Sequence, residues 1–186
     1  MAEPDAKSFI ALMDTAELAD LGPGPRPGVE LEGAIEEKLR ALFEKSKIPM
    51  RNQGLIRALI LLWHDHLESA HRIAQDIETA DGSFVHGIMH RREPDYGNAK
   101  YWFRRVGSHP AFAQLAERSS SVLEEKRATP LHDQLIGNGQ WDAMRFVDAC
   151  EEAARKGKSA PEYQLLRRIQ QIESETLIET FCSRGR

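Results

Sequence analysis

The sequence predicts an all-α protein, and three observations support this fold class. Apolar residues recur at helical spacing through most of the 186 residues. Prolines and glycines gather at a few positions that separate these periodic segments. No two alternating segments joined by a hairpin turn suggest a sheet. We therefore expect a single-domain bundle of about seven to nine helices around one long central helix, at about residues 52–79.

The first part of the chain predicts an arm that precedes the main domain. Residues 5–20 have an amphipathic helical pattern. The LGPGPRPG sequence of residues 21–28 contains three prolines and three glycines, which exclude regular structure. We expect residues 1–28 to form a helical arm with a Pro/Gly linker, either docked or mobile. Residues 29–186 would form the single domain, which would begin with a helix over residues 29–47.

The central helix is predicted from the longest apolar stripe in the chain. Eight apolar residues at helical spacing form this stripe: Ile56, Leu59, Ile60, Trp63, Leu67, Ala70, Ala74 and Ile77. Asp81 and Gly82 are expected to end the helix. The longest strongly apolar run, residues 59–63, is far shorter than the ~20 residues that a membrane span needs, so we expect no membrane association.

Short helices are predicted after the central one, and longer helices close the chain. Ser83 can cap a helix over residues 84–93, and Pro94 cannot continue it. Asn98 can cap the next helix, over residues 99–106. Four further helices are expected at residues 110–127, 129–136, 140–156 and 161–182. The last would bury seven apolar residues: Leu165, Leu166, Ile169, Ile172, Leu177, Ile178 and Phe181.

Composition and charge predict a soluble, cytoplasmic protein that does not bind nucleic acid. The net charge is −4 and the pI is near 6.0, whereas nucleic-acid binding normally requires a basic stripe and a high pI. The acidic N-terminal sequence lacks a signal segment. Cys150 and Cys182 belong to no metal-binding motif, and we expect two ordinary thiols. A homo-oligomer is compatible with this composition.

Residues 84–110 concentrate the chemically versatile side chains. They contain five Lys and Arg against two acidic residues, a local excess of three positive charges in an acidic chain. Arginine binds carboxylate or phosphate through paired hydrogen bonds, and Tyr and Trp provide stacking faces. We therefore expect a polar pocket that binds a small anionic or hydroxyl-rich molecule and could act on it. Its candidate ligand-binding residues are Arg91, Arg92, Tyr96, Asn98, Tyr101, Trp102, Arg104 and Arg105.

The same segment also has a structural interpretation. The arginines could pair with Glu93, Asp95 and acids elsewhere, and so lock the short helices to the core. The protein would then be a non-enzymatic interaction or scaffold protein. Its working surface would be the acidic helices and residues 1–28.

Clustered histidines predict a metal site and give a third hypothesis, a metal-dependent hydrolase. Spacings of four and three residues would place His64, Glu68 and His71 on one side of the central helix. His86 and His90 are four residues apart and can share a metal on one helix face. His71 would join them if the helix after Gly82 folds back on the central one. The candidate ligands are therefore His64, Glu68, His71, His86 and His90.

A divalent cation is the cofactor that this third hypothesis needs, and the other two need none. Histidine suits proton transfer because its unperturbed pKa is about 6.5. The candidate catalytic residues are His64, Asp65, His71 and His90. His64-Asp65 also resembles the paired residues of the all-helical HD-type metal phosphohydrolases. That family requires a further histidine upstream, and this chain has none before His64.

A longer resemblance covers residues 59–113. Its strings are LWHDHLESAHRIAQ and HGIMHRREPDYGNAKYWFRRVGSHPAF, with a weaker match at residues 146–150. These resemble a group of small soluble helical proteins, largely uncharacterised, from bacteria and fungi. The resemblance implies one helical domain and assigns no role to any residue.

Overall fold

The regular elements of the computed structural model, which describes residues 4–183, are all helices. The all-α prediction is therefore confirmed. Ten α-helices and two short 3₁₀ helices form the described part of the chain, one more α-helix than the upper end of the prediction. Their bounds are α1 (Ala6–Ile10), η1 (Ala11–Met13), α2 (Glu32–Phe43), α3 (Met50–Trp63), α4 (Leu67–Ala74), α5 (Ala80–Arg92), α6 (Tyr96–Val106), α7 (Ala111–Glu125), α8 (Thr129–Leu135), η2 (Gly137–Gly139), α9 (Ala143–Lys156) and α10 (Pro161–Ser183).

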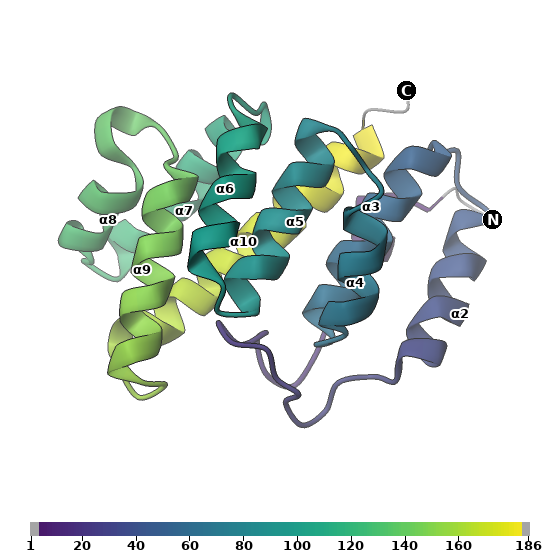
Figure 1. Cartoon of the computed structure of the whole chain (residues 1–186), viewed down its shortest axis with the longest axis horizontal. Coiled ribbons are helices and arrows are strands. Elements are labelled where there is room, and N and C mark those ends of the chain that lie inside the picture. The colour runs from purple at the N-terminus through teal and green to yellow at the C-terminus, as the bar shows by residue number, and fades with distance from the viewer. Residues whose placement is uncertain (1–3, 184–186) are drawn as a thin grey trace.

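The longest helix is α10, with 23 residues, and it organises the core. Figure 1 shows it crossing behind α6 and α5. It contacts α7, α3, α9 and α1, so it packs against helices from distant parts of the chain. Six of its seven predicted apolar residues are buried, and Leu165 is half-buried. The helical spacing therefore identified this packing face correctly.

The prediction of one central helix over residues 52–79 is wrong, because the segment forms two helices. It breaks after Trp63, and α4 begins at Leu67. At the break Asp65 has a φ of 65°, in the left-handed region that few non-glycine residues adopt. The expected end at Asp81 and Gly82 is also wrong, because both lie in the first turn of α5, whose N-cap is Thr79.

A buried ion cluster occupies this break. The Asp65 carboxylate accepts hydrogen bonds from the Arg26 guanidinium at 2.6 Å, from the Arg26 backbone N–H at 2.8 Å and from Arg92 at 2.7 Å. Arg92 also donates to the carbonyls of Leu62 and Gly22. The side chains of Arg26, Arg92 and Asp65 are only 5%, 2% and 1% exposed. These contacts lie far from Asp65 in sequence, so the local apolar pattern cannot show them.

The N-terminal segment, residues 4–31, is largely irregular, and it packs against the helices. The helix expected over residues 5–20 is limited to α1 and η1, and irregular chain continues to α2. Its apolar side chains Phe9, Met13, Ala19 and Leu21 are buried in the same core as the rest. Both nitrogens of His64 bind this segment, since Nδ1 accepts from the Glu30 N–H at 3.1 Å and Nε2 lies 2.7 Å from the Leu12 carbonyl.

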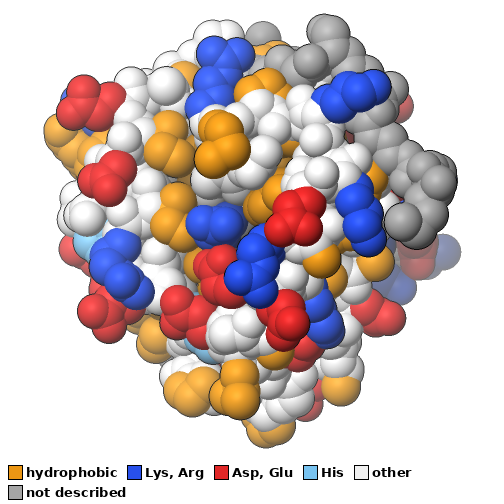
Figure 2. Space-filling view, turned by 90° about the vertical axis from the view of Figure 1, so that its right-hand side faces the viewer, with side chains coloured by type: hydrophobic (Ala, Val, Ile, Leu, Met, Phe, Trp, Pro, Cys, Tyr) orange, Lys and Arg blue, Asp and Glu red, His pale blue; other side chains and the backbone are white. Residues whose placement is uncertain are grey.

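The surface on the α2 side of the molecule carries mixed charge. Figure 2 shows acidic and basic side chains interspersed with apolar ones there, without a stripe of one sign. Between residues 4 and 183, no helix has both the length and the apolar character required to cross a membrane.

Replacing Asp65 should destabilise the fold strongly. Asp65→Ala leaves two buried guanidinium groups without their carboxylate, a loss that typically costs about 3–5 kcal/mol. Urea denaturation should report a reduced free energy of unfolding of this size. Glu152→Ala removes the exposed i,i+4 partner of Lys156 and serves as the control, with an expected loss below about 1 kcal/mol. Equal losses in the two variants would refute the role assigned to the cluster.

The stability of the fold should fall when His64 is protonated. Burial lowers the pKa of His64 in the folded state below its usual value. Between about pH 6.5 and that lowered pKa the unfolded chain binds more protons, so the free energy of unfolding decreases as pH falls. In His64→Gln, urea denaturation from pH 7.5 downward should show a smaller slope in this window. An unchanged slope would contradict this assignment.

Candidate metal centre

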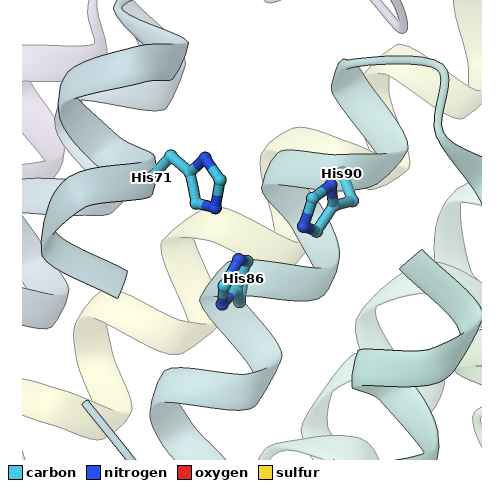
Figure 3. Close-up of side chains that lie close together, drawn as sticks. All are labelled: His71, His86 and His90. Carbon is cyan, nitrogen blue, oxygen red and sulfur yellow. The ribbon is translucent and has the colours of Figure 1, made fainter. Parts of the chain in front are cut away.

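Three histidines converge where α4 packs against α5. His71 lies on α4, and His86 and His90 lie one turn apart on α5. Residues 75–79 connect the two helices, and α5 folds back on α4. This arrangement brings His71 close to His86 and His90. Figure 3 shows the three rings between the two helices. One ligand nitrogen from each lies within 4.8 Å of the others, which is close enough for one cation to reach all three after small side-chain movements.

The rings are held by stacking. The His86 ring lies nearly parallel to that of His90, with centroids 4.9 Å apart and an angle of 11°. On Trp102 it stacks more closely, with a centroid distance of 3.9 Å and an angle of 17°. The His71 ring is tilted against both, at 4.8 Å from His86 and 5.3 Å from His90. Trp102 therefore forms a wall of the cluster.

Three ring nitrogens of this cluster lack a hydrogen-bond partner among the described residues. Both ring nitrogens of His86 and Nδ1 of His90 are buried. None of these three atoms forms a hydrogen bond within the described part of the chain. A Glu93 carboxylate oxygen lies 3.2 Å from His90 Nδ1, within ion-pair distance but out of line for a hydrogen bond. Buried polar atoms are paired in the large majority of cases, so an unpaired set requires an explanation.

Burial favours the neutral form of His86 and of His90. Burial, reinforced by the neighbouring His90 and His71, lowers the pKa of His86 to about 4. Burial also lowers the pKa of His90, and the Glu93 carboxylate opposes that effect. A neutral imidazole retains the lone pair that a metal ion binds.

The other two predicted metal ligands, His64 and Glu68, lie outside this cluster. The break at Asp65 separates His64 from His71, so the predicted shared helix side does not exist. His64 is bound to the N-terminal segment, and Glu68 is exposed. Asp65, a predicted catalytic residue, is paired with Arg26 and Arg92 and lies outside the histidine cluster.

Arg91 and Arg92, predicted to bind an anionic ligand, are consumed by internal contacts. The completely buried Arg91 side chain pairs with Glu173 and lies 4.3 Å from the centre of the Phe146 ring. Arg92 belongs to the Asp65 cluster. The structural interpretation therefore describes these two residues correctly.

The remaining predicted ligand-binding residues lie on α6. Asp95 caps this helix by accepting from the Asn98 backbone N–H at 3.1 Å, so the prediction that Asn98 is the cap is wrong. Tyr96 is half-buried, and burial raises its pKa. Arg104 and Arg105 are exposed, and the Arg105 guanidinium lies 5.4 Å from the Trp102 ring centre and 5.9 Å from that of Tyr101.

Two large hollows lie apart from the histidines. A mostly apolar groove of about 560 Å³ lies between α7, α8 and α10 and is lined by residues including Val122, Leu131 and Leu165. A more polar hollow of about 740 Å³ is lined partly by Phe103 and Trp141. Neither is lined by any of the predicted ligand-binding residues.

The cysteines do not contribute a ligand or nucleophile to the cluster. No disulfide joins them in the described part of the chain. Cys150 is buried, and burial raises its pKa to about 12, so its reactive thiolate form is scarce at neutral pH.

The sequence analysis does not predict the contact of Glu93 with His90 or the stacking of Trp102 on His86. The three-residue spacing of His90 and Glu93 was a usable signal for the first contact. Trp102 was assigned to ligand stacking, and only the packing of α6 on α5 places it against a histidine.

Comparison with protein-family models, with curated proteins and with solved structures reveals no significant similarity to any of them. The chemistry of the site must therefore be inferred from its geometry.

Proposed function

We propose that this protein binds one divalent transition-metal ion through His71, His86 and His90 and uses it to hydrolyse a small substrate. The observation that carries this proposal is His86, a buried imidazole with neither nitrogen hydrogen-bonded among the described residues. A neutral imidazole contains one donor and one acceptor, and leaving both unpaired in the interior is unfavourable. A metal ion bound to the acceptor nitrogen would offset part of this penalty.

Convergence of three histidines favours a cation over an isolated unsatisfied side chain. Two helices each direct imidazole groups into the same space, and their ligand nitrogens lie within 4.8 Å of one another. Burial depresses the pKa of His86 and His90, so these ligands do not have to lose a proton at neutral pH before they bind. His71 is half-buried, which brings the cluster to the surface at that side and gives a cation a route of entry.

The donor set indicates the class of metal. Three imidazole nitrogens suit Zn²⁺, Cu²⁺ or Ni²⁺, whereas Mg²⁺ and Ca²⁺ require oxygen ligands. Zinc sites with three protein ligands typically keep a fourth position for water, and zinc lowers the pKa of that water to about 7. The resulting hydroxide would add to a carbonyl or phosphoryl centre, and the leaving group would depart with a proton.

The metal-free protein should bind one equivalent of Zn²⁺ in calorimetric titration. His86→Gln and His90→Gln each remove a metal ligand, so each should weaken Zn²⁺ binding by more than roughly 100-fold. Loss of a residue that only hydrogen-bonds to a ligand typically costs roughly 10–100-fold. His132→Gln, on α8, is the control and should bind as the unaltered protein does. Equal affinity in all four proteins would refute the metal centre.

Hydrolysis should depend on the bound metal. The Zn²⁺-loaded protein should accelerate the release of p-nitrophenol from p-nitrophenyl acetate, because metal-bound hydroxide is a strong nucleophile near neutral pH. Chelation should abolish this activity, Zn²⁺ should restore it, and His86→Gln should lack it. Tight zinc binding without metal-dependent hydrolysis of acetate or phosphate esters would leave a metal-binding protein and overturn the proposed hydrolysis.

A further inference from the structure

Glu93 is the acidic residue in contact with the histidine cluster. It follows α5 directly, and its backbone N–H donates to the Met89 carbonyl at the helix end. It lies three positions after His90, and its Oε2 lies 3.2 Å from His90 Nδ1. The His90 side chain is 7% exposed whereas that of Glu93 is 49% exposed, so the carboxylate approaches a buried ring from the solvent side.

This inference rests on the proposed metal centre. We infer that Glu93 is a positioning residue of that centre, which holds the proton on His90 Nδ1 and so presents Nε2 to the cation. A histidine nitrogen facing a carboxylate must carry the hydrogen to donate, and this leaves the lone pair on the opposite nitrogen. Metal-bound histidines almost always make such an outer contact, which fixes the ring and increases its basicity.

Charge gives Glu93 a second contribution. Imidazole binds a metal ion in its neutral form, so three such ligands would not compensate the charge of a bound dication. Glu93 supplies a negative charge next to one ligand, because its Oε2 lies 3.2 Å from His90 Nδ1. Its half-exposed carboxylate can turn into line with Nδ1 without disturbing the core.

Glu68 provides a matched comparison. It lies three residues before His71 on α4, and it is exposed. No hydrogen bond or ion pair between Glu68 and a histidine is found in the described part of the chain. The two glutamates therefore have the same spacing from a metal-binding histidine, but only Glu93 contacts one.

The experiment compares Glu93→Gln with Glu68→Gln in the full chain. Zn²⁺ affinity is measured by competition with a chromophoric chelator, and the ligand field is measured from the visible spectrum of the Co²⁺-substituted protein. We expect Glu93→Gln to weaken Zn²⁺ binding roughly 10–100-fold without moving the Co²⁺ bands, because no ligand is lost. Glu68→Gln should match the unaltered protein in both measurements. Both glutamates are on the surface, so thermal unfolding of the metal-free variants should stay unchanged.

Three outcomes would overturn the inference. Unaltered Zn²⁺ affinity in Glu93→Gln would show that the contact has no role in binding. Equal weakening in both variants would show a general effect of surface charge. Displaced Co²⁺ bands in Glu93→Gln would make Glu93 a direct ligand. If the unaltered protein binds no Zn²⁺, the metal centre itself fails, whereas the other outcomes reject only the role of Glu93.

Discussion

Two buried guanidinium groups share the carboxylate of Asp65, and this cluster joins three separate parts of the chain. Arg26 comes from the N-terminal segment, Asp65 from the break between α3 and α4, and Arg92 from the end of α5. A buried charge is tolerated only when paired and hydrogen-bonded, so each group restricts the position of the other two. The carbonyls of Gly22 and Leu62 accept three further hydrogen bonds from Arg92 and strengthen that restriction.

The cluster also determines how the histidines meet. If the helix continued through residues 64–66, His71 would lie on an extension of α3. The left-handed backbone of Asp65 instead lets α4 run in a new direction. Arg92 ties α5 to the same break only two residues after His90. The two helices that carry the three histidines are thus anchored next to the proposed site. A preorganised site of this kind requires little rearrangement of the backbone to bind a cation.

Local patterns in the sequence were sufficient for most of the fold. Helical spacing identified the buried face of α10, and the i,i+4 pair His86 and His90 was correctly placed on one helix. The break at Asp65 could not be predicted, because the apolar stripe from Ile56 to Ile77 continues across it without a proline or glycine. Its cause lies in Arg26 and Arg92, which are 39 and 27 residues away, and tertiary contacts of this kind override local preference.

The roles of the arginines could not be separated by sequence for the same reason. Arg91 and Arg104 have similar neighbours in the chain, yet Arg91 is completely buried against Glu173, 82 residues later, while Arg104 is exposed. A bundle in which helices from distant segments pack together makes such pairings depend on topology. Residue type and spacing therefore predicted which segment is chemically unusual, but not which of its side chains are free to act.

The contrast within α5 is the strongest argument for a ligand at the histidines. This helix is buried along nearly its whole length, and it carries four large polar side chains into the interior. Arg91 and Arg92, whose burial is the most costly, both have carboxylate partners supplied by distant segments. The same helix leaves both nitrogens of His86 unpaired while stacking its ring between His90 and Trp102. Among the described residues, Arg91 keeps one unpaired nitrogen, Nε, but its guanidinium has a carboxylate partner, whereas His86 has no partner at either nitrogen. An apolar residue in place of His86 would therefore stabilise the fold, unless that imidazole binds something from outside the chain.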